Sequence, residues 1–349
     1  MNVGLQVFCC ILSFFVLILP VASIIIGKVR LKRALKPIDY YPPRGYSPID
    51  VMIKYYGSHA KAHGLINPIM LYWASRGFIT IEEDCKRGLK LTKLKDLKPP
   101  KHIIDADITA QENYEIELKY FNLLFGSGDV FYTLTADSSY NKTNNAFIKD
   151  CGTSARGART KLTTGLSYLS MISAFIVAAI NTLTVGLSTG SGSLMLMSIF
   201  PLVGMIAFRA IGNFDDDIAA IIKYPFFIIW GGVPLVVLLT MIGGSAAAVL
   251  GVSMATSAFV IDFLAERIDI RSQADIEVYG KICAFKTFLL HAERDRVETL
   301  IEDNPDYYYD ILPYCYVLKI TDKLMAVFDR ITLDGPSWYL GDLRNTLMF

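Results

Sequence analysis

The sequence predicts a mainly α-helical membrane protein with about five transmembrane helices, a winged-helix-like insert and a helical tail. Lysine and arginine are absent from three long apolar windows, residues 1–27, 162–208 and 224–266. Basic stretches flank these windows, as at 28–33 and 156–161. Apolar windows of this length with basic flanks are typical of multi-pass membrane proteins, and the flanks set the orientation.

The first window, residues 1–27, predicts a transmembrane helix. Its apolar run from about Leu5 to Ile26 exceeds the core of a signal peptide, and no basic residue precedes it. We therefore expect a membrane anchor and not a cleaved leader. Because the basic flank follows the helix, the N-terminus is expected outside and residue 28 onward in the cytoplasm.

Residues 166–263 predict transmembrane helices two to five. Breaks rich in glycine and serine at 188–193 and 243–245 divide the segment into spans of about 166–187, 194–211, 225–242 and 246–263. This arrangement places every basic flank on one side of the membrane. The expected location is the plasma membrane, multi-pass, with the C-terminus cytoplasmic and the lipid bilayer as a partner.

Ionisable side chains are missing from the interior of all five predicted spans, and Asp262 lies only at a cytoplasmic edge. Ion-coupled transporters usually need such groups within the membrane, so their absence argues against coupled transport. A passive channel or transporter component stays open as an alternative. Asn181 is the one strongly polar side chain within a span, and we expect it to hydrogen-bond a neighbouring helix.

Four small residues recur every four positions along the last predicted span, and they predict a helix-packing seam. Small residues at this spacing let helix backbones approach closely in lipid. A tight hairpin with the fourth span is the favoured interpretation, and a homo-oligomer seam is the alternative. The residues are Gly243, Ala247, Gly251 and Ala255.

After a basic and proline-containing linker, 28–45, residues 46–98 predict a winged-helix-like cytoplasmic domain. Ser47-Pro48 opens a helix through about Tyr56, and Asn67-Pro68 opens a second that ends near Arg76-Gly77. A hairpin then follows, with strands at 78–82 and 89–94.

A winged helix raises the hypothesis of a membrane-tethered DNA-binding regulator. Base reading needs exposed polar side chains along the recognition helix, but 69–76 is almost wholly apolar and only Arg76 could serve. The net charge of +1 also provides no field that would attract nucleic acid. A role in protein–protein interaction is therefore favoured over DNA binding.

Residues 99–165 predict a cytoplasmic helical segment, and 264–349 a cytoplasmic helical tail. In the first, a capping box at Thr109–Glu112 starts an amphipathic helix, and the polar stretch 129–160 is expected to be loosely helical. In the tail we expect a long helix over 272–302, a second opened by Asn304-Pro305 and a third capped by Thr321. The aromatic residues of this tail predict a partner surface: Tyr307, Tyr308, Tyr309, Pro313, Tyr314 and Trp338.

No combination of residues predicts catalysis, a cofactor site or a metal site. The six cysteines include no CxxC pair, so neither zinc nor a disulfide framework is indicated. His59 and His63 have helical spacing but lack a companion carboxylate or cysteine. The sequence therefore predicts that the chain is not an enzyme.

Several motifs of the tail resemble the C-terminal signature of the YciQ-like predicted membrane proteins, a bacterial family without an assigned activity. Similar elements occur upstream at Pro42-Pro43, Ser47-Pro48 and 74–79. Family members usually carry an extracellular β-rich domain before the first span, whereas this chain starts at that span. The resemblance implies an architecture and carries over no catalytic residue. Its tail motifs are Gly280, 285–289, Ala292-Glu293, Asp295-Arg296, Asn304-Pro305, 312–314, Val317-Leu318 and 336–339.

Together these observations favour a membrane-anchored scaffold or regulator that binds a cytoplasmic or membrane protein partner. The passive channel and the DNA-binding regulator are the two alternatives from other functional classes.

Overall fold

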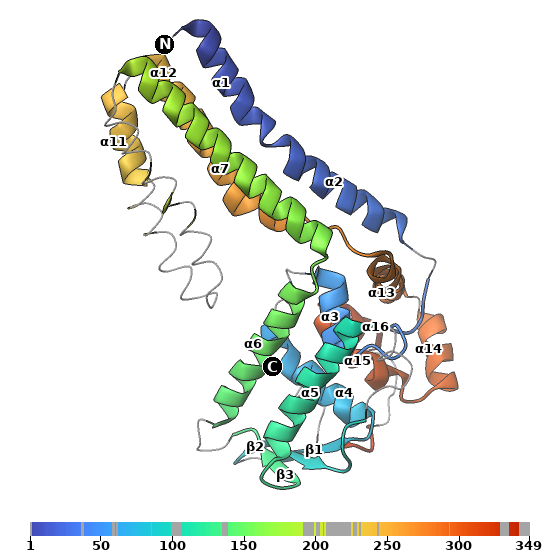
Figure 1. The fold of residues 1–349 in the computed structure, drawn as a ribbon. Helices are drawn as coiled ribbons and strands as arrows, with labels where there is room; N and C mark the ends of the chain where they lie inside the picture. Colours follow the sequence, from blue (N-terminus) through green and yellow to red (C-terminus); the bar gives the residue numbers. More distant parts are fainter. Residues whose placement is uncertain are drawn as a thin grey trace. The chain divides into compact units, whose positions relative to one another are not determined.

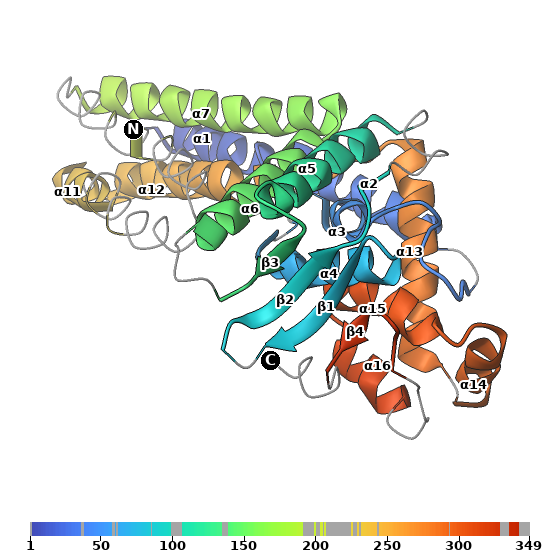
Figure 2. The same cartoon turned by 90° about the horizontal axis from the view of Figure 1, so that it is seen from below.

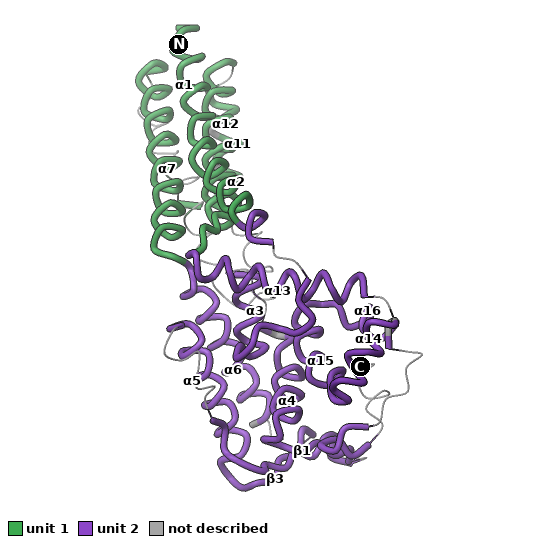
Figure 3. The backbone as a smooth tube through the Cα atoms, turned by 90° about the vertical axis from the view of Figure 1, so that its right-hand side faces the viewer, with its two compact units in different colours: residues 1–30, 160–271 green, residues 31–159, 272–349 purple. Residues whose placement is uncertain are grey.

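The fold was analysed in a computed structural model. It describes residues 2–35, 38–57, 60, 62–84, 86–98, 107–134, 139–190, 233–242, 244–292, 294–328 and 335–341, with isolated positions between 199 and 232. These residues form two compact units, coloured separately in Figure 3. Unit 1 comprises 1–30 and 160–271, and unit 2 comprises 31–159 and 272–349.

Unit 1 is built of long apolar helices (Figure 1). Three helical stretches are long and apolar enough to cross a membrane: Val3–Arg33, Lys161–Thr189 and Gly244–Arg267. They correspond to the first, second and fifth predicted spans. Their elements are α1 (Val3–Phe15), α2 (Ile18–Arg33), α7 (Lys161–Thr189) and α12 (Gly244–Phe259), the last continuing through η4 (Val260–Leu264) and η5 (Ala265–Arg267).

The other two predicted spans are covered less completely. The third, 194–211, lies almost wholly outside the described residues. The fourth, 225–242, is described chiefly over α11 (Val233–Ile242), which packs against α12. Three membrane-length helices are therefore established by length and composition, and the count of five stays a prediction.

The described helices of unit 1 expose many large apolar side chains and bury several small or uncharged polar ones beside aliphatic residues such as Val177 and Leu250. Phe8 and Phe15 of α1 and Leu187 of α7 are exposed, whereas Ser13 and Ser170 are fully buried. Such a pattern would be unfavourable in water, but it is the one expected when lipid surrounds the helices and close backbone approach drives their packing.

The basic ends of three helices meet at one end of unit 1. Gly27 lies so close to the carbonyl group of Asp269 that a Cβ would overlap it, which ties α2 to the segment after η5. At the start of α7, Thr163 Oγ1 accepts from Ile270 N at 2.8 Å and donates to Ile270 O at 2.9 Å. The predicted orientation requires the basic residues to gather at one end of the helices, as they do here. Which side of the membrane this end faces stays a prediction. The basic residues concerned are Lys28, Arg30, Lys161, Arg267 and Arg271.

Unit 2 combines helices with a small sheet. Its insert contains α3 (Pro48–Tyr56), η2 (Ala62–Leu65), α4 (Ile66–Ser75), β1 (Ile79–Asp84), β2 (Gly88–Lys93), α5 (Ile108–Phe125), β3 (Val130–Tyr132) and α6 (Ser139–Gly157). Its tail contains α13 (Gln273–His291), α14 (Arg294–Asp303), α15 (Tyr307–Val317), α16 (Thr321–Phe328) and β4 (Tyr339–Leu340).

The helices and hairpin predicted over 46–98 are present. Ser47 and Asp50 form a reciprocal capping box with Pro48 at the first helical position of α3. The hairpin pairs Thr80 with Thr92 and Glu82 with Lys90, the latter also an ion pair of 2.8 Å. These elements agree with the expected order, and the winged-helix assignment itself stays a prediction.

The sheet is larger than the predicted hairpin. Its strand order is β3-β2-β1-β4, with β4 parallel to β1 and β3 antiparallel to β2 (Figure 2). Residues 130–132 were expected to be loosely helical and 339–340 to lie in a helical tail, so both expectations were wrong. Strand β3 has three residues and strand β4 two. Each pairs with a strand that is distant in the sequence, so no local alternation pattern marks it.

Several helix boundaries also differ from the prediction. The α4 helix begins at Ile66 after Leu65 and not at Asn67-Pro68, and α15 begins at Tyr307 after Asp306 and not at Asn304-Pro305. The long tail helix expected over 272–302 is broken at Ala292, whose extended backbone separates α13 from α14. The α5 helix is capped by Asp107, whose carboxylate accepts from the backbone N–H groups of Thr109 and Ala110, and not by Thr109. By contrast, Ser272 caps α13 as expected, whereas Thr321 is the first helical residue of α16 and not its cap.

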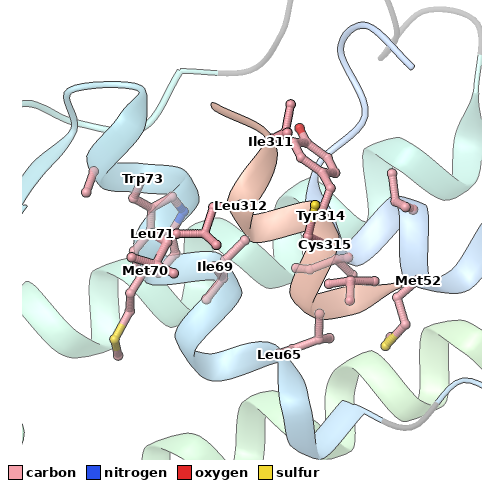
Figure 4. Packing of buried hydrophobic residues seen from close by; sticks show 14 of the residues in the cluster. Met52, Leu65, Ile69, Met70, Leu71, Trp73, Ile311, Leu312, Tyr314 and Cys315 are labelled. Atoms are coloured by element: carbon pink, nitrogen blue, oxygen red, sulfur yellow. The ribbon is translucent and has the colours of Figure 1, made fainter. Parts of the chain in front are cut away.

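The insert and the tail share one hydrophobic core, so the prediction of separate cytoplasmic parts at 46–98, 99–165 and 264–349 is corrected. The core contains Trp73 of α4, Phe121 of α5, Phe285 of α13 and Tyr314 of α15, all nearly or fully buried. Figure 4 shows Ile69 and Leu71 of α4 beside Leu312 of α15. An insert that precedes the second predicted span and a tail that follows the last therefore fold together.

Candidate functional site

The aromatic tail residues predicted as a partner surface lie mainly inside unit 2. Tyr307 donates from its hydroxyl to Tyr40 O at 2.7 Å, and Tyr314 donates to Tyr46 O at 2.8 Å. Tyr307, Tyr308, Pro313 and Tyr314 are buried. That part of the prediction is wrong, because the linker covers α15 and its carbonyl groups satisfy the tyrosine hydroxyls in the core.

Tyr309 and Trp338 contribute instead to a hollow of about 270 Å³, here called the tail hollow. Their rings meet edge to face, with centroids 5.9 Å apart and an angle of 86°. Trp338 is half-buried, and Tyr309 is 6 % exposed. The tail hollow is lined by Ala74, Ser75, Gly77, Thr80, Leu94, Asp306, Tyr309, Asp310, Ser337 and Trp338.

Two carboxylates, Asp306 and Asp310, line the tail hollow at the start of α15. Asp306 is exposed, and Asp310 accepts from Asn304 Nδ2 at 3.2 Å. Desolvation raises the pKa of Asp310, although the Asn304 bond and the nearby Arg76 charge oppose the shift. Arg76 lies over the Tyr72 ring, 5.6 Å from its centroid. This site combines aromatic surface with negative charge.

A second group of polar residues is buried where three helices of unit 2 meet. Lys54 of α3 is 6 % exposed and pairs with Asp107 at 2.8 Å and Asp275 at 2.5 Å. Burial lowers the pKa of Lys54, but the two carboxylates raise it by more, so the net shift is upward. Since Asp107 caps α5 and Asp275 lies in the first turn of α13, one ammonium group joins three helices.

Two further carboxyl groups are buried nearby without a cation bound to them. Asp50 accepts from Asn113 Nδ2 at 2.7 Å, and Glu117 accepts from Trp73 Nε1 at 2.7 Å. Burial raises the pKa of Asp50 to about 6 and that of Glu117 to about 8, against the lowering effect of these hydrogen bonds. Ser154 extends the network by donating to Asn113 Oδ1 at 2.5 Å.

The cavity beside Asp50 and Glu117 has a volume of only about 30 Å³. A single water needs about 10–15 Å³ by this measure, so the space suits one or two waters and excludes an organic substrate. Its lining includes Ser47, Tyr72 and Tyr114. We therefore assign this network to the structure of unit 2, with no role in chemistry on a substrate.

A third polar group lies between the helices of unit 1. Asn181 of α7 is fully buried, and three acceptors, Cys9 O, Ser13 Oγ and Ser253 Oγ, lie 2.9–3.2 Å from its Nδ2, whose two hydrogens they share. The expectation that Asn181 bonds a neighbouring helix is confirmed for both α1 and α12. A further bond, from Ser257 Oγ to Ala174 O at 3.0 Å, joins α12 to α7.

The predicted small-residue seam is described in part. Gly251 faces α11, where a Cβ would lie 3.7 Å from a methyl carbon of Leu239. Ala247 is half-buried and Ala255 is exposed, while Gly243 lies outside the described residues. The hairpin and homo-oligomer interpretations both stay predictions.

The described residues include no group of three histidine, cysteine, aspartate or glutamate side chains that could hold a metal. His59 and the side chain of His63 lie outside the described part. Five cysteines are described, and all are free thiols. The α4 helix buries Ile69, Trp73 and Ala74 in the core, so these residues are not available to read bases.

Comparisons with models of protein families, with curated proteins and with solved structures found no match. The resemblance to YciQ-like proteins thus rests on the sequence motifs alone and stays a prediction. Within this fold many of the motif residues are explained by packing, since Phe285, Phe288 and Leu289 lie in the core and Lys286 donates to Leu318 O at the end of α15.

Sequence reasoning missed the Lys54 network and the buried acids. Asp107 directly precedes a helix and Asp275 follows Ser272 by three residues, and both positions are typical of helix caps. The cap positions of Asp107 and Asp275 predict two helix starts. They do not predict that Lys54 forms ion pairs with both carboxylates. The apolar face of α5 could have drawn attention to Glu117, which lies between Asn113 and Tyr120 on the buried side of that helix.

Proposed function

We propose that this chain is a membrane-anchored scaffold or regulator whose unit 2 binds a protein partner through the tail hollow. The supporting observation is the tail hollow itself, an aromatic and acidic concavity built jointly by the insert and the tail. Interface hot spots are enriched in tryptophan and tyrosine that provide large contact areas, as the half-buried Trp338 could here.

The membrane part of the proposal rests on unit 1. Three helices are long and apolar enough to cross a bilayer, and many of their large apolar side chains are exposed. Their basic ends meet, which fits the cytoplasmic face by the positive-inside rule. Unit 2, with its water-facing ion pairs and buried aromatic core, then acts in the cytoplasm.

The two alternative functions have weaker support. A passive path would need room between the helices, whereas Asn181, Ser13 and Ser253 fill the described centre of unit 1 and bond to one another. A DNA-binding role would need an exposed polar face on α4, but most of that helix is core.

The test is co-purification of the full chain from native membranes in mild detergent, followed by mass spectrometry. Deleting the tail would remove half of the core, so a point change in the tail hollow is needed. Thr80 lines the tail hollow, and Thr92 is its cross-strand neighbour on the same face of the sheet but outside the lining. Thr80→Tyr should fill the tail hollow, and Thr92→Tyr is the matched control.

We expect a partner at near-stoichiometric yield with the wild type and Thr92→Tyr, and its loss with Thr80→Tyr. A partner that Thr80→Tyr retains would refute the tail hollow as the binding surface. A wild-type preparation without any partner would refute the scaffold function, and solute flux into liposomes would then test the channel alternative.

A further inference from the structure

We infer that the tail hollow receives a lysine or arginine side chain of the protein partner. This inference rests on the proposed function and specifies the chemistry of the partner. It is carried by the meeting of perpendicular aromatic rings and two carboxylates around one concavity.

The aromatic walls favour a cation. Trp338 and Tyr309 stand at 86° to each other, so an incoming group can contact the face of one ring and the edge of the other. A lysine or arginine cation is attracted to an aromatic face, most strongly to tryptophan. Unit 2 already shows this contact elsewhere, with Lys95 Nζ 4.9 Å from the Phe78 centroid and Arg87 4.9 Å from the Tyr132 centroid.

The carboxylates supply the counter-charge. Asp306 is exposed, and none of the ion pairs found among the described residues includes Asp306 or Asp310. The N-terminal end of α15 adds a partial positive charge, which these two full charges outweigh. The end of α4, at Ala74 and Ser75, contributes the partial negative charge of a helix C-terminus.

Among the described residues, two cations lie close to the tail hollow, and neither belongs to its lining. Arg76 lies over the Tyr72 ring and interacts with the Tyr314 hydroxyl, and its charge also acts on Asp310. Lys95 is near the rim, with Nζ 3.6 Å from the position of a Cβ on Gly77, and it lies over Phe78. Asp306 is exposed, and it is the carboxylate most accessible to an external cation.

The volume also favours a side chain over a free metabolite. About 270 Å³ lies below the roughly 300–1,000 Å³ of small-molecule sites, whereas a single long side chain entering from a peptide backbone needs less room. Lysine and arginine can also lay their aliphatic stems on Leu94 and the Trp338 ring while the charge reaches the carboxylates.

The experiment uses the purified full chain in mild detergent and three acetylated, amidated pentapeptides: Gly-Ser-Lys-Ser-Gly, Gly-Ser-Arg-Ser-Gly and the neutral Gly-Ser-Gln-Ser-Gly. Binding is followed by tryptophan fluorescence, with Trp338→Phe to show that the signal comes from the tail hollow. The Asp306→Asn, Asp310→Asn double variant tests the carboxylates, and Asp303→Asn, an exposed change at the end of α14, is the control.

We expect millimolar binding of the lysine and arginine peptides, no saturable binding of the glutamine peptide, and weakening by 0.5 M salt. The double variant should reduce affinity about tenfold, and Asp303→Asn should leave it unchanged. Equal binding of the glutamine peptide, or an equal effect of Asp303→Asn, would overturn the cation site. A lack of saturable binding of the lysine and arginine peptides would also overturn the cation site. In that case the scaffold proposal would still stand if capture of the cellular partner depended on Thr80. Conversely, if the cationic peptides bound but no cellular partner co-purified, the scaffold function would be refuted and the cation site would stand.

Discussion

Unit 1 and unit 2 differ in the side chains that fill their interiors. In unit 1 the described interior combines aliphatic side chains such as Leu250 and Met254 with serine, asparagine and small residues, and hydrogen bonds between uncharged groups join its helices, as from Asn181 to Ser13. In unit 2 the interior contains tryptophan, tyrosine and phenylalanine, and it also accommodates the charge of Lys54. Many large apolar side chains, including Phe8 and Phe15, are exposed in the first unit, whereas the aromatic core of the second unit is buried.

This difference is the one expected of the proposed arrangement, with unit 1 in lipid and unit 2 in water. In water, burial of apolar surface drives folding at roughly 25 cal/mol per Å², and the aromatic core of unit 2 exploits that gain. In lipid the same burial gains nothing, so helices associate through close packing and interhelical hydrogen bonds. The comparison predicts that single changes will affect unit 2 more strongly than unit 1.

The largest effect is expected from Glu117→Gln and depends on pH. The pKa of Glu117 rises from 4.5 in the unfolded chain to about 8 in unit 2. Between about pH 4.5 and about pH 8 the folded state therefore binds more protons than the unfolded chain. Within this range the free energy of unfolding falls by about 1.4 kcal/mol for each unit by which the pH rises. Glutamine stays neutral and still accepts from Trp73, so the variant should lose this dependence.

We expect Glu117→Gln to exceed the wild type by a few kcal/mol at pH 9 and to match it near pH 4. Asp50, whose pKa rises to about 6, contributes a similar slope in both proteins between about pH 3.8 and 6. Hydrogen exchange of unit 2 peptides, measured by mass spectrometry across this pH range after correction for intrinsic rates, checks the prediction. Parallel pH profiles for the two proteins would contradict it.

The next effect is expected from Lys54→Met. Methionine fills similar space but leaves Asp107 and Asp275 partly buried without their cation, at a cost of about 3 kcal/mol. Because the carboxylates belong to α5 and α13, exchange should rise in both helices. Lys119→Met is the control, since its ion pair with Asp150 is largely exposed and is expected to contribute under 1 kcal/mol. Equal losses for the two variants would contradict the assigned role of Lys54.

Local signals made the helices predictable from the sequence. Ser47-Pro48 and Ser272 mark helix starts because a side-chain oxygen or a fixed proline ring acts within one turn. The apolar windows likewise depend only on composition over about twenty residues. These features need no knowledge of the rest of the fold.

The shared core and the tail hollow could not be predicted in this way. The Tyr307 hydroxyl meets a carbonyl 267 positions away, and without that contact its aromatic run fits a surface equally well. Strand β4 has two residues, and its pairing with β1 is set by the fold and not by a local alternation. The tail hollow combines residues 74–94 with 306–338, so it exists only once the tail has packed on the insert.

Within unit 1 the largest change is expected from Gly27→Ala. A Cβ at this position would overlap the carbonyl of Asp269, so α2 must move away from the segment after η5. Overpacking of this kind costs about 1–3 kcal/mol, reduced by the roughly 1 kcal/mol that alanine gains over glycine in a helix. Gly165→Ala in α7 is the control, because its Cβ meets nothing within 4 Å and the change should be neutral or stabilising. Unfolding in mixed micelles of increasing SDS fraction measures both variants, and equal stability would contradict the close contact.

The smallest effect is expected from Asn181→Leu, although Asn181 Nδ2 has three acceptors on neighbouring helices. The reason is that its Oδ1 atom has no hydrogen-bond partner among the described residues, so the amide already carries a desolvation cost that leucine removes. Hydrogen bonds between membrane helices also average only about 0.6 kcal/mol. We therefore expect a loss of about 1 kcal/mol by the same SDS titration, against almost none for Thr184→Leu, where the outward-facing hydroxyl bonds only to its own helix. A loss as large as that of Lys54→Met would show that polar contacts, and not close packing, dominate the stability of unit 1.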